Sequence, residues 1–278
     1  MGCSPKSEKR QRKDNIVLCS VCSGQLICDP DTGEEVCGSC RIITKEREEQ
    51  AASKSIKKPE GLFVATGHNS IEVASNPIIV EYVSDMSSSN GCPQILYPWD
   101  LLRIMNSALE SKIQTKCISS NATVSDRSII RGPCLIEDGV YIDDFCKILG
   151  PTYIGKNSNI GTGSLIRNCM IGAESNIGFN CEIGRSYLAG NNAIPHHNVI
   201  LDSIVGQNTW MGGYVGTTNF LLNKQNIRFK LGDRLVDTGV THFGAVIGPD
   251  CAIGAGVLTL PGRFIPSNSQ IQPGIVVS

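Results

Sequence analysis

Aliphatic residues recur at every sixth position through much of the C-terminal part of the chain. Nine consecutive matches to this interval are Ile118, Val124, Ile130, Ile136, Ile142, Ile148, Ile154, Ile160 and Ile166. An α-helix repeats every 3.6 residues and a strand every two, so neither element alone produces a six-residue period. A fixed period of this kind is typical of a solenoid, in which each repeat stacks on the next.

The six-residue period continues toward the C-terminus with small shifts of register. Its later positions are Ile171, Ile177, Ile183, Leu188, Ile194, Ile200, Ile247, Ile253, Ile265 and Ile271, with Thr259 at one step. A small residue follows four places after most of them, so each rung of six residues places one large and one small side chain inward. Three rungs make a triangular coil, and residues 113–278 are predicted to form a parallel β-helix of roughly eight or nine coils. The same spacing predicts four interior cysteines: Cys134, Cys146, Cys181 and Cys251.

An irregular segment and a helix are expected before the repeats, within residues 61–112. Leu62–Val83 is rich in β-branched residues and predicts two or three strands. Pro98 suits the first turn of a helix, and apolar residues follow it at helical spacing, at Leu101, Leu102, Met105 and Leu109. This bridging helix is expected to cap the end of the β-helix and cover its apolar rim.

Two CxxC pairs lie near the N-terminus, within residues 15–43. Cys19 and Cys22 form the first pair, and Cys37 and Cys40 form the second after fourteen intervening residues. Four thiolates brought together in this way suit tetrahedral Zn²⁺ in a closed structural site. The segment is too short for a hydrophobic core of its own, so zinc binding would supply its folding energy. Two chance pairs or a redox motif are the alternatives.

The spacer between the two cysteine pairs reads as a hairpin. It contains an Asp-Pro-Asp-Thr-Gly turn flanked by the β-capable stretches Gln25–Cys28 and Glu34–Val36. The run VLCSVCSGQLICDPDTGEEVCGSCRIITKEREEQ resembles the N-terminal zinc ribbon of transcription factor IIB, over about a tenth of the chain. The resemblance implies a ribbon fold and a protein partner, because that family's ribbon contacts RNA polymerase. Ser23 and Arg41 replace the glycine that usually follows each CxxC, and the cyclin-like DNA-binding repeats are absent.

Charge and composition restrict the remaining classes of function. The formal net charge is −1, so no global basic field favours nucleic acid as a partner. No apolar run reaches the roughly 18 residues of a membrane span, and no secretory leader is apparent. Zinc and interior positions explain most of the 13 cysteines, which indicates a reducing, cytoplasmic compartment. Residues 1–14 are expected to form a disordered charged leader, and residues 44–60 a solvated helical or flexible linker.

The repeat is interrupted by an insertion predicted at residues 215–243, and three of the four histidines lie around it. Insertions in a solenoid gather on one face and usually make its binding surface. His197 and His242 are interpreted as surface or loop residues. His196 is the candidate for chemistry, and the alternative is a corner residue on an inactive scaffold.

The repeat region resembles the hexapeptide acyltransferase family, and in particular the C-terminal half of archaeal bifunctional sugar-1-phosphate nucleotidylyltransferases. The resemblance spans about residues 95–278. It rests on IGKNSNIG, IGAESNIG, PWDLL, Ile194-Pro195-His196, Asp202-Ser203-Ile204, Gly212-Gly213, Thr218-Asn219, Gly244–Gly248 and Pro261-Gly262. It implies a left-handed parallel β-helix that forms homotrimers, with ligand sites between neighbouring subunits.

In that family the acyltransferase half moves an acetyl group from acetyl-CoA to an amino-sugar-1-phosphate. The resemblance implies that His196 is the general base on the sugar amine and that Asn219 binds the sugar or orients the nucleophile. It also implies that Lys224 and Arg228 pair with the phosphate. A neutral imidazole near pH 7 can accept the proton of an amine that attacks a thioester. Acetyl-CoA would then be the co-substrate.

Several positions depart from the pattern of that family. Val199 replaces a tyrosine, the GAGT turn reads GGYVGTT, and residues 1–94 contain no Gly-rich nucleotide loop. Two other classes of function therefore remain: a non-catalytic β-helix partner of a sugar nucleotidylyltransferase, and a transcription-related protein recruited through its ribbon. A β-helical carbonic anhydrase would need three histidines spaced across coils, which the histidine positions do not offer.

Overall fold

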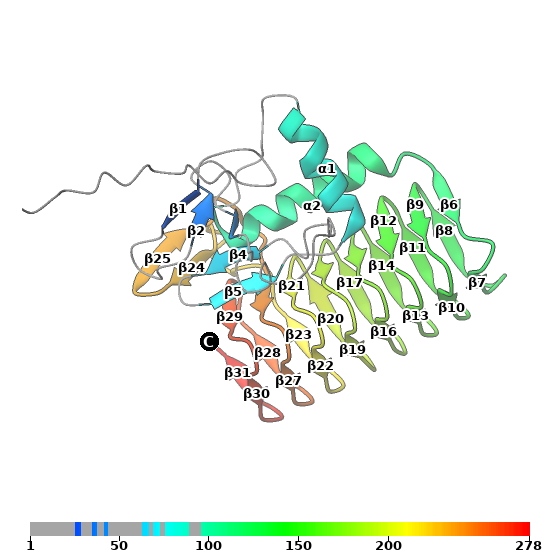
Figure 1. Cartoon of the computed structure of the whole chain (residues 1–278). Helices are drawn as coiled ribbons and strands as arrows, with labels where there is room; N and C mark the ends of the chain where they lie inside the picture. The colour runs from blue at the N-terminus through cyan, green and yellow to red at the C-terminus, as the bar shows by residue number, and fades with distance from the viewer. Residues whose placement is uncertain are drawn as a thin grey trace, which may run out of the picture.

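The computed structural model describes residues 26–28, 35–37, 42–43, 63–66, 69–72, 76–88 and 96–278. Most of the described chain is a parallel solenoid whose coils stack from β6 to β31 (Figure 1). Two helices and a short antiparallel sheet precede it in the sequence. No helix among the described residues is long and apolar enough to cross a membrane.

Three parallel sheets of eight strands each form the three faces of the solenoid. The first face contains β6 (Lys116–Ile118), β9 (Cys134–Ile136), β12 (Thr152–Ile154), β15 (Met170–Ile171), β18 (Tyr187–Leu188), β21 (Ile204–Val205), β26 (Ala245–Ile247) and β29 (Arg263–Ile265). The second face contains β7 (Thr123–Val124), β10 (Tyr141–Ile142), β13 (Asn159–Ile160), β16 (Asn176–Ile177), β19 (Ala193–Ile194), β22 (Trp210–Met211), β27 (Ala252–Ile253) and β30 (Gln270–Ile271). The third face contains β8 (Ile129–Arg131), β11 (Lys147–Leu149), β14 (Leu165–Arg167), β17 (Glu182–Gly184), β20 (Val199–Leu201), β23 (Gly216–Thr217), β28 (Leu258–Thr259) and β31 (Val276–Val277).

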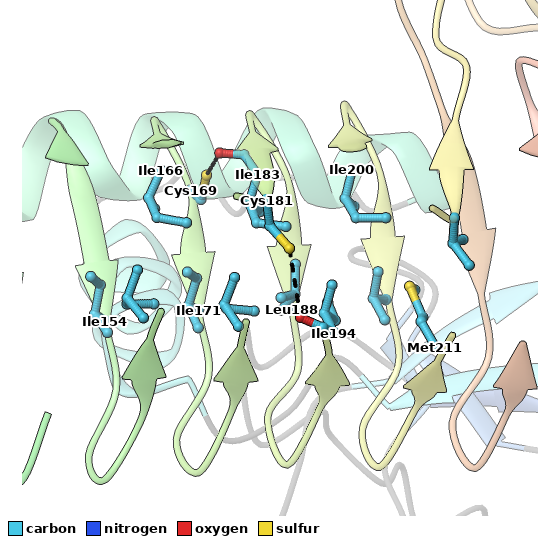
Figure 2. Close-up of a cluster of buried hydrophobic side chains, with 14 of the residues drawn as sticks. Ile154, Ile166, Cys169, Ile171, Cys181, Ile183, Leu188, Ile194, Ile200 and Met211 are labelled. Atoms are coloured by element: carbon cyan, nitrogen blue, oxygen red, sulfur yellow. Dashed lines mark hydrogen bonds between the residues drawn. The ribbon is translucent and has the colours of Figure 1, made fainter. Parts of the chain in front are cut away.

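The repeating aliphatic residues stack in columns inside the coils, as Figure 2 shows for Ile166, Ile183 and Ile200. These side chains are fully buried, and the β-helix prediction is confirmed. The small residues of each rung lie beside them and often donate to a carbonyl oxygen of the next coil. Ser158 Oγ, for example, lies 3.2 Å from Gly172 O, and Cys181 Sγ lies 2.7 Å from Pro195 O. Many inward hydroxyl and thiol groups are thus paired, whereas Asn198 Nδ2 and Thr259 Oγ1 are buried without a hydrogen-bond partner among the described residues.

The four cysteines predicted to be interior are all buried, and Cys169 joins them. Burial raises the pKa of the Cys169 thiol to about 11. Desolvation also raises the pKa of Cys181 and Cys251, since a thiolate is poorly solvated in an apolar interior. These thiols therefore fill space and are not nucleophiles.

The shifts of register in the sequence arise at one corner of the coil, between the third and first faces. In the early coil the corner is Gly150-Pro151, and hydrogen-bonded residues one coil apart are separated by 18 residues: the Cys146 N–H donates to Ser128 Oγ. In the middle coils a single residue with positive φ turns this corner, at Asn168, Arg185 and Asp202, and the separation falls to 17 residues. In the last coils the separation is again 18 residues.

The helix predicted at Pro98 is α2 (Pro98–Lys112), but its position differs from the expectation. It lies along the first face instead of capping an end of the solenoid (Figure 1). Outward residues of that face, including Tyr153, Met170 and Tyr187, are buried in one cluster with Leu101 and Met105. The outward positions of this face are apolar over several coils, so a helix covers the side of the solenoid.

The segment predicted to hold strands is only partly extended. β4 (Phe63–Thr66) and β5 (Asn69–Glu72) are strands, whereas α1 (Pro77–Ser88) is a helix. Asn76 Oδ1 accepts the Ile78 N–H at 3.0 Å, and Pro77 occupies the first turn, where its missing N–H costs nothing. Ile79 and Val83, at helical spacing, are buried against α2. Capping and packing therefore override the β propensity of this run.

β1 (Leu26–Cys28), β2 (Glu35–Cys37) and β3 (Ile42–Ile43) join β4 and β5 in a five-stranded antiparallel sheet. The pairing of β1 with β2 confirms the predicted hairpin strands in the spacer. Three of the expected zinc ligands, Cys19, Cys22 and Cys40, lie outside the described residues, as do the leader 1–14 and the linker 44–60. The zinc site thus stays a prediction.

The insertion begins later than predicted, because Gly216–Thr217 completes a coil as β23. Residues 218–244 leave the solenoid as an excursion. This excursion contains a hairpin of β24 (Arg228–Leu231) and β25 (Arg234–Asp237). Phe229 and Phe243 of this excursion are fully buried and meet the ring of Trp99 edge-on, at 5.6 and 6.0 Å between centroids. The excursion therefore folds back onto the start of α2.

Candidate functional site

His196 lies at the corner where the chain passes from the second face to the third, between β19 and β20. Its side chain is exposed, and its carbonyl oxygen accepts the Tyr214 N–H of the next coil at 3.0 Å. A Cβ added to Gly213 on that coil would meet only His196 O, at 3.4 Å. The surface is therefore open at Gly213 beside His196, and the His196 side chain is exposed.

His197 is held by its neighbours. Its backbone is left-handed (φ 56°), its ring stacks on Tyr214 at 4.9 Å, and Phe179 meets it edge-on at 5.2 Å. Asn180 Nδ2 lies 3.1 Å from its Nδ1. These contacts make His197 a packing residue of the same corner.

Asn219 is located at the opposite edge of the third face from His196. It follows β23, and its backbone oxygen accepts the Phe243 N–H at 3.0 Å, which places it at the corner between the third and first faces. A strand rises about 3.3 Å per residue, so the two corners are on the order of 15 Å apart. One chain therefore does not bring His196 and Asn219 together.

The two predicted phosphate ligands lie on the excursion and are exposed. Lys224 has a left-handed backbone (φ 60°) in the turn before the hairpin, and Arg228 begins β24. His242, also exposed, stacks on Phe220 at 4.9 Å where the excursion returns to the solenoid. Both cations are therefore on the Asn219 side of the third face.

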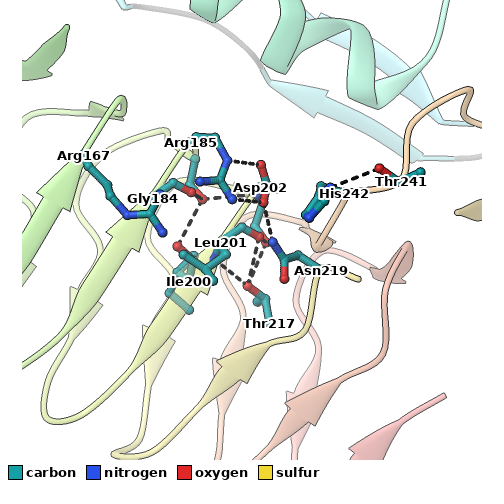
Figure 3. Close-up of polar contacts among 12 residues, drawn as sticks. Arg167, Gly184, Arg185, Ile200, Leu201, Asp202, Thr217, Asn219, Thr241 and His242 are labelled. Atoms are coloured by element: carbon teal, nitrogen blue, oxygen red, sulfur yellow. Dashed lines mark hydrogen bonds and ion pairs between the residues drawn. The ribbon is translucent and has the colours of Figure 1, made fainter. Parts of the chain in front are cut away.

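A network of charged side chains at the Asn219 corner was not anticipated from the sequence (Figure 3). Arg185 Nε and Nη2 donate to the two carboxylate oxygens of Asp202 at 2.7 and 2.6 Å. Asn219 Nδ2 donates to Asp202 Oδ2 at 2.5 Å. Arg167 pairs with Glu182 on neighbouring coils, with Nη2 to Oε1 at 2.6 Å.

One signal in the sequence could have located this network. Asp202 is separated by 17 residues from both Arg185 and Asn219, which is the length of the shorter coil. Residues one coil apart lie directly above one another, so opposite charges at that spacing form pairs. The aliphatic period describes only the inward positions, whereas these charged residues occupy outward positions.

The described residues contain no cluster of three or more side chains suited to hold a metal ion. The candidate groups are an exposed imidazole at one corner, and an amide, a carboxylate and two exposed cations at another. An imidazole can accept a proton from a nucleophile, and the cations can hold an anionic group. Such a set of groups suits group transfer to a phosphorylated substrate.

The chain is similar to several known proteins. Residues 133–168 match the family model described as bacterial transferase hexapeptide (six repeats). The chain is 29% identical over 160 residues to the putative uncharacterized acetyltransferase YaiX of Escherichia coli K12, covering 58% of this chain and 62% of that protein. It is 29% identical over 182 residues to a bifunctional sugar-1-phosphate nucleotidylyltransferase/acetyltransferase of Sulfurisphaera tokodaii, covering 65% and 45%.

Among solved structures, a UDP-N-acetylglucosamine acyltransferase is 18% identical, with a TM-score of 0.34, over 58% of this chain and 70% of that one. The chain spans less than two thirds of the length of the two relatives named above. The hexapeptide match supports the left-handed β-helix of hexapeptide repeats expected from the sequence.

Proposed function

We propose that the protein is an N-acetyltransferase that uses acetyl-CoA to acetylate an amino-sugar phosphate. The observation that carries the proposal is the exposed imidazole of His196, at an open corner of a hexapeptide β-helix. The similarity of the repeat region to proteins described as acetyltransferases supports the reaction class. The bifunctional relative, which is described as acting on sugar-1-phosphates, supports the substrate class.

The proposed reaction begins with the free amine of the sugar. As the amine nitrogen attacks the thioester carbonyl carbon, His196 accepts a proton from that nitrogen and a C–N bond forms. The tetrahedral intermediate then collapses, the C–S bond breaks, and coenzyme A departs. The imidazolium returns its proton to the departing sulfur, so the products are the N-acetyl sugar phosphate and free coenzyme A.

The separation of His196 and Asn219 on one chain supports a site shared between copies. In a homotrimer, the His196 corner of one subunit would face the Asn219 corner of the next, with Lys224 and Arg228 beside the phosphate. Aliphatic side chains that a second copy would cover stand outward on the third face between the two corners. They include Val199, Leu258 and Val276, which are 41%, 42% and 55% exposed.

The test is acetyl-CoA-dependent acetylation of glucosamine-1-phosphate and galactosamine-1-phosphate by the wild type and by His196→Ala. General-base catalysis contributes roughly 10²–10⁴-fold, so kcat/KM should fall at least a hundredfold. His197→Ala is the matched control, because it removes the adjacent imidazole from the same corner, and it should retain activity within about tenfold.

Two outcomes would contradict the proposal. Activity that survives in His196→Ala would exclude His196 as the base. A folded wild-type trimer that acetylates neither sugar would favour a non-catalytic partner of another sugar-nucleotide enzyme.

A further inference from the structure

Asp202 connects three consecutive coils with the base of the excursion. It lies at the corner after β20 with a left-handed backbone (φ 47°), and only 7% of its surface is exposed. Its backbone N–H donates to Gly184 O of the preceding coil at 2.9 Å. Its carbonyl oxygen accepts the N–H of Gly244, where the excursion ends, at 2.8 Å. Its carboxylate holds Asn219, where the excursion begins.

The partners of the Asp202 carboxylate determine how Asn219 is oriented. A carboxylate only accepts hydrogen bonds, so the Asn219 amide must face it with Nδ2. The bidentate pair with Arg185 fixes the plane of the Asp202 carboxylate. Asn219 Oδ1 therefore points away from Asp202, and no described residue donates to it. The corner therefore presents a carbonyl oxygen acceptor that Asp202 holds in a fixed orientation (Figure 3).

We infer that Asp202 is a positioning residue of the proposed acetyl-transfer site, which fixes Asn219 so that its carbonyl oxygen accepts a hydrogen bond from a substrate N–H or O–H. This inference rests on the proposed function. Two substrates carry such donors: the amino sugar, with its hydroxyl and amine groups, and acetyl-CoA, with its amide N–H groups. Both substrates would therefore bring an uncharged or cationic hydrogen-bond donor to the Asn219 carbonyl oxygen.

Asp202→Asn tests the inference, because an amide at this position can donate as well as accept and no longer dictates the orientation of Asn219. The KM of the substrate that contacts Asn219 should rise about tenfold, which corresponds to one lost hydrogen bond of about 1.4 kcal/mol, while kcat stays within about threefold. The affected substrate, acetyl-CoA or glucosamine-1-phosphate, identifies the source of the donor.

Glu182→Gln is the matched control. It breaks the corresponding arginine–carboxylate pair of the preceding coil, in which Glu182 accepts from Arg167 and not from Asn219. Both KM values should stay within about twofold of the wild type. A rise of equal size in Glu182→Gln and Asp202→Asn, or unchanged KM values in Asp202→Asn, would overturn the inference while the acetyltransferase function stands.

A second variant covers the case in which Asp202→Asn leaves Arg185 unpaired and the protein fails to fold. The double change Arg185→Met with Asp202→Asn removes both charges, and neutral replacement of an ion pair is often tolerated. Thermal melting should then be close to that of the wild type, and the same tenfold rise in KM is expected. Wild-type KM values in this folded double variant would overturn the inference.

The inference remains testable if the wild type turns over neither sugar, which would refute the proposed function. Binding of coenzyme A and of glucosamine-1-phosphate would then each be measured by titration calorimetry. A Kd about tenfold weaker in Asp202→Asn than in Glu182→Gln for either ligand supports the positioning role. Equal Kd values of the two variants for both ligands, or no binding of either ligand by the wild type, overturn it.

Discussion

Gly178 is the position at which one added methyl group tests the stacking of the coils most directly. It follows β16, and its N–H donates to Ile194 O of the next coil at 2.8 Å. An added Cβ would lie 2.5 Å from Pro195 O, 2.7 Å from its carbonyl carbon and 2.9 Å from its Cα. All three atoms are backbone atoms of the next coil, so no side chain can rotate away.

Relief of this clash requires the two coils to separate. Non-bonded carbon atoms prefer about 3.5–4.0 Å, so the coils would have to move by roughly 1 Å. Overpacking of this kind costs about 1–3 kcal/mol, and stretching the Gly178 hydrogen bond costs about 1 kcal/mol more. We therefore expect Gly178→Ala to lower the free energy of unfolding by roughly 2–4 kcal/mol. At about 2–4 °C per kcal/mol, Tm should fall by roughly 5–15 °C.

Gly213→Ala is the control for this prediction. Its Cβ would meet one atom, His196 O, at 3.4 Å, and its backbone does not have the positive φ that only glycine adopts readily. Alanine at a compatible position stabilises by about 0.4–1 kcal/mol through the unfolded chain, so its Tm should match or slightly exceed that of the wild type. Thermal melts of both variants at one scan rate make the comparison. Equal Tm values for Gly178→Ala and Gly213→Ala would refute the stacking argument.

Three further predictions concern the metal, the thiols and acid stability. Metal analysis should find about one Zn²⁺ per chain, and Cys37→Ser should lose it; a zinc-free wild type would refute the ribbon. At pH 8 a thiol reagent should modify the exposed Cys117 in the native state, whereas Cys169, with a pKa of about 11, should react only after unfolding, as peptide mapping would show. The hydrogen bond from Thr162 holds the pKa of Asp143 below its usual value. The ionised carboxylate therefore stabilises the folded state at pH values above the ordinary Asp pKa, and this stabilisation is lost as the pH falls through the lowered pKa. Urea unfolding between about pH 5 and pH 2 should therefore show a shallower acid loss in both Asp143→Asn and Thr162→Val, and an unchanged slope in both would contradict this assignment.

Local sequence patterns were sufficient wherever an element depends on its own period. The aliphatic period predicted the β-helix and its interior cysteines, because every rung faces the same interior and must supply the same kind of side chain. Pro98 and the spacing after it predicted the start of α2 correctly. Both patterns repeat within a few residues, so no knowledge of distant neighbours is required.

Local sequence patterns gave wrong predictions where contacts with residues distant in the sequence decide the structure. The β-branched run around Ile78–Val80 was expected to be extended, but α1 forms because Asn76 caps it and α2 covers its apolar side. α2 was expected at an end of the solenoid, and the apolar outward residues of the first face place it on the side instead. The boundary of the insertion was also misplaced, since only pairing with the neighbouring coil shows that Gly216–Thr217 is a strand.

The sequence also predicted some features of the candidate site and not others. The sequence by itself determined a β-helix of hexapeptide repeats with an interrupted coil, and it singled out His196, Asn219, Lys224 and Arg228. Only the tertiary structure decided that His196 and Asn219 lie at opposite corners of one face, and that Asp202 orients Asn219. The physical reason is that the inward period is a local property of each rung, whereas contacts between corners depend on the length of every coil. That length changes from 18 to 17 residues and returns to 18 in the last coils, and it sets which side chains stand above one another.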